Sequence, residues 1–186
     1  EVGLLEKQSA TYFQAKSARS VIRGNVFFNN PRSIINLNDG FGGGDEIAHN
    51  LVLSSCRESG DHGPINTWDR QPYLTTVRTG RPSVIMEWRE IHHNLLIDNY
   101  SPQYTVDNDD GSQYYKTHNN VLVYGEQGMK NQAAGHDNWH FENLYLYVTS
   151  ALGVVSWCAE DSRCHPHTFD ASADASVGFN IFQNNS

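Results

Sequence analysis

The chain has 186 residues, a formal net charge of −8 and a sequence pI near 5.5. This length suffices for one domain with a sizeable core, and the acidic balance argues against nucleic acid or an anionic membrane surface as a partner. No apolar run approaches transmembrane length, so we expect no membrane insertion.

A short unit recurs along the chain: an Asn followed by a brief apolar run rich in β-branched and aromatic residues. The copies are 22–28, 47–53, 91–99, 117–123, 140–146 and 177–182. The Asn spacing is 25 residues from Asn25 to Asn50, 26 from Asn94 to Asn120 and 23 from Asn120 to Asn143, with longer steps from Asn50 to Asn94 and from Asn143 to Asn180. A period in the twenties that is interrupted by insertions predicts a solenoid.

Such short apolar runs favour stacked β-strands over a helical solenoid. One short strand cannot bury its apolar face alone, but each coil of a solenoid covers the previous one. The Asn side chains can then hydrogen-bond from coil to coil at the strand spacing of about 4.8 Å. We therefore predict an asparagine ladder, formed by Asn25, Asn50, Asn94, Asn120 and Asn143.

In chain order, residues 1–20 form a partial coil, and the first full coil spans 22–46, with one strand to about Phe28 and a second at 33–37. The second coil begins at Ile47, and an excursion at 71–90 precedes the third. Later coils begin at 91, 117 and 140. No linker divides residues 1–186, which predicts a single domain; the repeat pattern reaches both ends, so a fragment of a longer solenoid is the alternative.

A second pattern aligns 35–39, 65–69 and 106–110. Each segment begins with an apolar residue, continues with Asn or Asp and ends with Asp. The alignment predicts two rows along the solenoid. One row contains Asp39, Asp69 and Asp110, and the other contains Asn36, Asn66 and Asp107, continued by Asn131.

These repeats resemble those of right-handed parallel β-helix proteins of the pectin-lyase-like fold. The resemblance implies an all-β solenoid of about five to six coils with little helix, and a secreted protein that acts on or binds a polysaccharide. The blocks 39–44, 60–64 with 68–73, and 107–112 look like a distinct subgroup to which we attach no activity. Asp109-Asp110 is similar to the paired Asp of polygalacturonases, but no Arg-Ile-Lys follows it. Fold analogy alone does not establish function.

Cysteine usage depends on the compartment. Cys158 and Cys164 are close enough to pair in a secreted protein, whereas in a cytosolic protein both would be thiols; Cys56 is left over.

The strongest candidate site combines Asp61-His62 with Asp69-Arg70. A His can act as a general base near neutral pH, and an Arg can bind a uronate carboxylate through two hydrogen bonds. This pairing suits β-elimination or epimerisation. The alternative is that both Asp residues cap turns and Arg70 pairs with one of them.

Asp107, Asp109 and Asp110 form a second candidate, because three close carboxylates repel one another unless a cation lies among them. Asp107 and Asp109 are candidate ligands for Ca²⁺, and paired carboxylates also serve glycoside hydrolases. Turn formation before Gly111 is the structural alternative.

Lys130 and His136 are expected beside these rows, where Lys130 would face an acidic substrate. The predicted site on one concave surface contains Asp61, His62, Asp69, Arg70, Asp110, Lys130 and His136, with Asp39, Trp68, Tyr73 and Tyr115 as substrate-binding residues. His49 and His93 share a repeat position and are expected to stack.

The leading functional hypothesis is a secreted lyase or epimerase acting on an acidic polysaccharide, with a glycoside hydrolase as a weaker option. The alternative is a noncatalytic carbohydrate-binding or structural extracellular solenoid. A cluster of Asp, His, Arg and Lys on one edge distinguishes the two, because a purely structural solenoid has no need of it.

Overall fold

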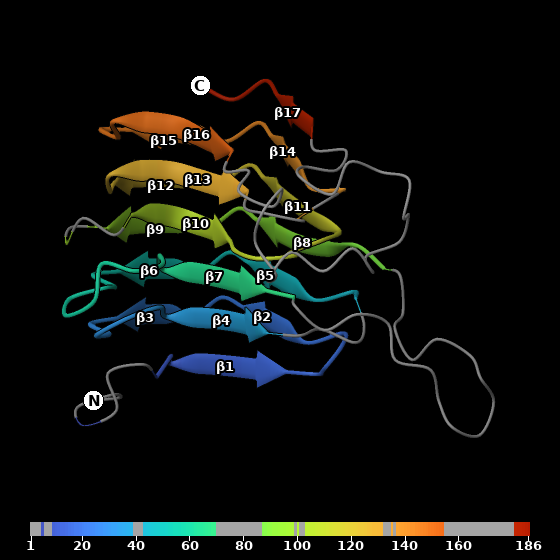
Figure 1. Cartoon of the computed structure of the whole chain (residues 1–186), viewed down its shortest axis with the longest axis horizontal. Helices are drawn as coiled ribbons and strands as arrows, with labels where there is room; N and C mark the ends of the chain where they lie inside the picture. The colour runs from blue at the N-terminus through green and yellow to red at the C-terminus, as the bar shows by residue number, and fades with distance from the viewer. Residues whose placement is uncertain are drawn as a thin grey trace, which may run out of the picture.

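The computed structural model describes residues 5, 9–38, 43–69, 87–98, 100, 103–131, 135, 137–154 and 181–186. The regular elements of this part of the chain are all strands, and they stack as a parallel β-helix of about five coils. Figure 1 shows the stack rising from β1 near the N-terminus to β16 and β17 near the C-terminus. Over the described residues, no helix has the length and apolar character needed to cross a membrane.

Three parallel sheets, named A, B and C here, run the length of the stack. Sheet A contains β1 (Tyr12–Ala15), β4 (Ile35–Asn38), β7 (Ile65–Trp68), β10 (Tyr104–Asn108), β13 (Gln127–Asn131) and β16 (Ser150–Val154). Sheet B contains β2 (Val21–Arg23), β5 (Glu46–Ala48), β8 (Arg89–His92), β11 (Tyr115–His118), β14 (Trp139–Phe141) and β17 (Ile181–Gln183). Sheet C contains β3 (Val26–Phe28), β6 (Leu51–Leu53), β9 (Leu95–Asp98), β12 (Val121–Tyr124) and β15 (Leu144–Leu146).

Each full coil has three strands where the sequence suggested two. The extra break occurs just before each ladder Asn, where one residue adopts a left-handed backbone conformation. Its φ is +69° at Gly24, +56° at His49, +53° at His93 and +52° at Asn119. A single residue of this kind interrupts the extended backbone and turns the chain, so the expected first strand becomes one strand in sheet B and another in sheet C.

The asparagine ladder is confirmed. At its centre, Asn94 Oδ1 accepts hydrogen bonds from the backbone N–H and the side-chain Nδ2 of Asn50, both at 3.0 Å. Asn94 Nδ2 donates to the carbonyl of Ile47 at 2.9 Å and to Asn120 Oδ1 at 3.0 Å. The ladder therefore satisfies buried amides at every turn between sheets B and C.

The last coil differs from the predicted copy at 177–182. Asn143 donates to Asn185 Oδ1 at 3.0 Å, so Asn185 continues the ladder. β17 pairs with β14 in sheet B and therefore precedes the ladder Asn instead of following it. The spacing was misread because the last step of the ladder, from Asn143 to Asn185, spans 42 residues.

Rows of apolar side chains fill the interior. Ile35, Ile65, Val106 and Met129 align in sheet A and are fully buried. Ile47 and Ile91 do the same in sheet B, and Val52, Leu96 and Leu122 in sheet C. Burying each such side chain contributes about 1.5–3 kcal/mol before the entropy of ordering is subtracted.

The outward row of sheet A runs from Asn36 through Asn66 and Asp107, as predicted, but it continues with Lys130. Asn131 aligns with Asn108 on the inward side. The alternation of inward and outward residues explains why Lys130, and not Asn131, continues the row. Met129 must face inward beside Val106, so Lys130, the next residue, faces outward. Lys130 is thereby placed directly against Asp107.

The predicted excursion at 71–90 ends earlier than expected. Arg89 and Glu90 belong to β8, where Glu90 pairs with Glu46 of the preceding coil. Residues 71–86 of the excursion lie outside the described residues.

Candidate functional site

A loop over residues 55–63 covers the outer face of sheet A and carries His62. The N–H of Cys56 donates to the carbonyl of Arg32 at 3.0 Å, and Cys56 Sγ contacts the carbonyl of His62 at 3.5 Å. A Cβ on Gly63 would lie 1.6 Å from the carbonyl oxygen of Tyr104. Only glycine permits this approach, so the loop is seated directly against β10.

The backbone of His62 has a φ of +81°, which is rare for a residue with a side chain. Burial raises the pKa of the nearby Cys56 thiol to about 12, so the thiol remains protonated and contributes packing. The strained conformation and the tight contact at Gly63 together direct the His62 imidazole onto the outward row of sheet A.

His62, Asp107, Asp109 and Lys130 meet on that row. His62 Nδ1 lies 3.0 Å from Asp107 Oδ2 and 3.8 Å from Asp109 Oδ2. Lys130 Nζ lies 2.7 Å from Asp107 Oδ1 and 3.5 Å from Asp109 Oδ1. His62 Nδ1 and Lys130 Nζ therefore contact different oxygens of the Asp107 carboxylate.

Asp107 has no exposed side-chain surface, and it also accepts a hydrogen bond from Asn66 Nδ2 at 3.3 Å. Burial lowers the pKa of Lys130, but Asp107 and Asp109 more than offset it, and the net pKa is raised. Lys130 therefore stays charged, and the ring of Tyr104 lies 4.6 Å from its ammonium group.

Asp109 has a different environment from Asp107. Burial, and then the neighbouring charge of Asp107, raise the pKa of Asp109 above its usual range, and Lys130 offsets this only in part. About 14% of the Asp109 side chain is exposed, as is the same fraction of His62. Both groups therefore reach the surface above a buried carboxylate, with Asp109 retaining its proton to higher pH than an ordinary Asp.

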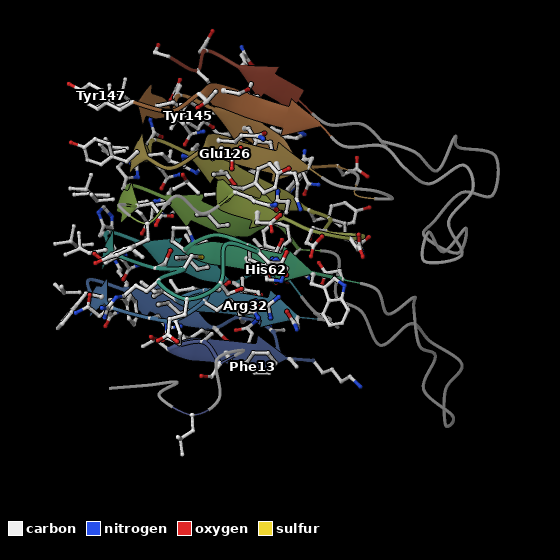
Figure 2. The ribbon with its side chains drawn as sticks, turned by 60° about the vertical axis from the view of Figure 1, so that its left-hand side comes forward. Phe13, Arg32, His62, Glu126, Tyr145 and Tyr147 are labelled. Carbon is white, nitrogen blue, oxygen red and sulfur yellow. The ribbon has the colours of Figure 1, made fainter. Side chains whose placement is uncertain are left out.

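Arg32 and Asp61 complete the exposed edge of this cluster. Arg32 Nη2 lies 2.9 Å from Asp61 Oδ2, and the same oxygen lies 3.6 Å from His62 Nε2. Figure 2 shows Arg32 and His62 at neighbouring levels of the stack. The Asp61 side chain is 65% exposed, and an ion pair so open to water is worth at most about 1 kcal/mol. A competing carboxylate can therefore displace it.

Asp107 and Asp109 were expected to bind Ca²⁺, but the structure places a different cation beside them. Lys130 supplies the positive charge that the adjacent carboxylates need. The side chains of His62, Asp107 and Asp109 do place one ligand atom each within 4.8 Å of one another. That set includes an imidazole, which suits a transition metal better than calcium.

Asp69 and Asp110 lie inside the solenoid, apart from the exposed cluster. Asp69 Oδ2 pairs with Arg89 Nη1 at 2.6 Å, and Asp69 and Asp110 are both nearly fully buried. Both residues follow the ends of their strands, β7 and β10, and the buried Arg89 of β8 holds Asp69 in the interior.

Tyr115 is fully buried, and its hydroxyl accepts a hydrogen bond from Arg89 Nη1 at 2.9 Å. Tyr115, which was predicted as a substrate-binding residue, therefore has no exposed surface to offer a substrate in this structure. Trp68, at the end of β7, is partly exposed and points to the outer face of sheet A by the alternation of the strand.

The remaining predicted site residues, Asp39, Arg70, Tyr73 and His136, lie outside the described residues, as do Cys158 and Cys164. Conversely, Arg32 was not predicted. It belongs to no motif, and only the path of the 55–63 loop brings it to His62.

The described site therefore joins Arg32, Asp61, His62, Asp107 and Lys130 across four successive coils, with Asp109 beside them. Comparison of the chain with protein-family models, curated proteins and solved structures found no match.

Proposed function

We propose that the protein is a secreted, carbohydrate-active enzyme of the pectin-lyase-like type that removes the proton next to the carboxylate of a uronate residue in an acidic polysaccharide. Lyase and epimerase chemistry share this step. The observation that carries the proposal is the His62 imidazole held at Nδ1 by the buried Asp107 carboxylate, 3.0 Å away, whose other oxygen is held by Lys130.

His62 Nε2 is the proton acceptor in this proposal. An Nδ1–H that donates to Asp107 leaves the lone pair on Nε2, which faces the exposed side of the cluster near Asp61. A charged carboxylate at Nδ1 also stabilises the imidazolium that forms when the proton is taken. Asp107 is fully buried and touches no substrate, so it is a positioning residue.

The carboxylate of Asp61 marks where a substrate carboxylate binds. It lies 2.9 Å from the Arg32 guanidinium and 3.6 Å from His62 Nε2. A uronate that displaces Asp61 places its carboxylate on Arg32 and its C5–H toward the imidazole. Arg32 then stabilises the negative charge that develops when C5 loses its proton.

The reaction is balanced by a proton donor. In a lyase, the C5–H electrons form the C4–C5 double bond, the bond from C4 to the glycosidic oxygen breaks, and the leaving oxygen takes a proton. In an epimerase, C5 receives a proton from solvent on its opposite face. The raised pKa of Asp109, which lies 3.8 Å from His62 Nδ1 and therefore on the same side of the sugar as the base, suits it to protonate the leaving oxygen of the lyase reaction.

Asp107 and Asp109 are not placed to act as the carboxyl pair of a glycoside hydrolase. Hydrolases need two carboxyl groups that flank the scissile bond. Asp107 is fully buried and already engaged by His62, Lys130 and Asn66, so only Asp109 of the pair reaches the surface.

The test is incubation with a panel of uronate polysaccharides, followed by ultraviolet absorbance for unsaturated ends and by NMR for epimerised residues. His62→Gln should abolish product formation with little change in thermal unfolding. The matched control is His118→Gln, which removes another imidazole bonded to a carboxylate, Glu90, on sheet B. That variant should retain activity. Equal activity of His62→Gln and the unaltered protein would overturn the proposal.

A noncatalytic solenoid is the second candidate, favoured by the outer face of sheet C. Its outward row is aliphatic in all five strands and consists of Val26, Leu51, Leu95, Val121 and Leu144. Val26 is 62% exposed, and such a face is typical of a protein that packs in a larger assembly. Binding of a polysaccharide without any product would favour this candidate.

A further inference from the structure

Three histidines gather at the corner between sheets B and C. His49 and His93 each occupy the left-handed position before a ladder Asn, in consecutive coils. Their rings stack with centroids 5.1 Å apart and planes 27° from parallel, which confirms the predicted stacking. His92, the last residue of β8, stands edge-on to both rings.

The ring nitrogens of these residues converge. One nitrogen from each imidazole lies within 4.8 Å of the other two, and His92 Nδ1 is 2.8 Å from His93 Nδ1. Nitrogens that share a tetrahedral Zn²⁺ at about 2.0–2.1 Å lie roughly 3.3 Å apart. Small side-chain rotations therefore suffice to place all three around one ion.

The close contact between the two Nδ1 atoms has a chemical consequence. Two neutral imidazoles can approach in this way only if one Nδ1 is protonated and the other is not, so that a single proton is shared. A divalent ion that binds both Nδ1 atoms displaces this proton, and the imidazole that carried it takes the tautomer protonated at Nε2, so both rings remain neutral ligands.

The surroundings of His92 suit a metal ligand. Its Nε2 lies 3.3 Å from Glu46 Oε1, and a carboxylate at the distal nitrogen orients a ligating imidazole and increases its basicity. His118 stacks on His92 with centroids 5.0 Å apart and planes 10° from parallel, which fixes the ring from another side.

His49 and His93 are exposed, so an ion can reach the corner from solvent.

We propose that His49, His92 and His93 form a binding site for a divalent transition-metal ion, with Zn²⁺, Ni²⁺ and Cu²⁺ as the class that three imidazoles select. The ion links the corners of two consecutive coils, with its remaining coordination positions open to water. This site is independent of the proposed enzymatic function.

The test uses calorimetric titration of the chelator-treated protein with ZnCl₂. His49→Asn and His93→Asn are the informative variants, because Asn119 occupies the equivalent left-handed position in the next coil and the backbone conformation is thereby preserved. One site per chain is expected, and each variant should weaken Zn²⁺ binding by about tenfold or more. Thermal unfolding without metal checks that both variants fold.

His62→Gln is the matched control, because His62, Asp107 and Asp109 form the other described group with metal-ligand spacing. Unchanged Zn²⁺ affinity in His62→Gln supports the corner site. The proposal is overturned if both Asn variants bind Zn²⁺ as tightly as the unaltered protein, or if His62→Gln alone loses binding.

Discussion

Lys130 Nζ lies 2.7 Å from Asp107 Oδ1, although the two residues belong to strands in successive coils and are both nearly or fully withdrawn from solvent. The register of sheet A creates this contact, because Met129 and Val106 face inward as neighbours and leave the following residues opposed on the outer face. The ion pair is thus a consequence of the alternation of inward and outward residues in sheet A. It fixes the Asp107 carboxylate, which in turn positions His62.

Removal of the Asp107 carboxylate should strand a buried ammonium group. We expect Asp107→Ala to lower the free energy of unfolding by about 3–5 kcal/mol, as measured by urea denaturation. In the double variant Asp107→Ala with Lys130→Met, part of this loss should be recovered, because no uncompensated charge remains. If the double variant is as unstable as the single one, the contacts of Asp107 with His62 and Asn66 account for the loss instead.

Two glycines of the covering loop offer a matched pair. A Cβ at Gly63 would lie 1.6 Å from the carbonyl oxygen of Tyr104, whereas a Cβ at Gly60 meets nothing within 4 Å. Gly63→Ala should lower both the melting temperature and the rate of product formation, because the loop that carries His62 can no longer seat on β10. Gly60→Ala should leave both unchanged. Equal behaviour of the two variants would contradict the packing described for this loop.

Asp98 should make stability depend on pH. It is buried on sheet C, and burial raises its pKa from 3.8 to about 8 even though Ser55 donates a hydrogen bond to it. Between about pH 4 and pH 8 the folded protein keeps this proton while the unfolded chain has lost it, so the free energy of unfolding falls as pH rises.

Asp98→Asn mimics the protonated acid and can still accept the hydrogen bond from Ser55. It should flatten the pH dependence of urea unfolding and exceed the unaltered protein in stability at pH 8. Glu126→Gln alters an exposed carboxyl group and serves as the control. A wild-type slope in Asp98→Asn would show that other groups determine the dependence.

The ladder predicts a graded effect along the stack. Asn94→Ala removes four side-chain hydrogen bonds, which involve Asn50, Ile47 and Asn120. At about 0.5–1.5 kcal/mol for each bond, the loss should be about 2–6 kcal/mol. Asn25, at the first rung, is exposed and its side chain donates to Asn50 alone, so Asn25→Ala should cost about 1 kcal/mol or less. Chemical denaturation of both variants distinguishes a cooperative ladder from independent turns.

The sequence predicted the fold well because two of its signals are strictly periodic. The Asn spacing identified the ladder from Asn25 to Asn143, and the aligned segments 35–39, 65–69 and 106–110 identified the register of sheet A. What failed was the expectation that Asp69 and Asp110 reach the surface. Both residues follow the ends of their strands and are nearly fully buried, and the partner Arg89 of Asp69 comes from a different sheet.

The site was predicted only in part. His62, Asp107, Asp109 and Lys130 were singled out, but not which of them touch. The contact of Lys130 depends on the strand register, which places Lys130 and not Asn131 beside Asp107. The contact of His62 with Asp107 depends on the path of the 55–63 loop, which has no periodic pattern. Arg32 enters the site for the same reason.

The most direct test of the central claim is the fate of the uronate C5 proton in D₂O, followed by NMR together with the absorbance of unsaturated product. With an active polysaccharide, the unaltered protein should remove this proton, giving either an unsaturated end or deuterium at C5. His62→Gln should do neither, while His118→Gln should match the unaltered protein. Retention of the C5 proton by every polysaccharide in the panel, or its removal by His62→Gln at the full rate, would contradict the account.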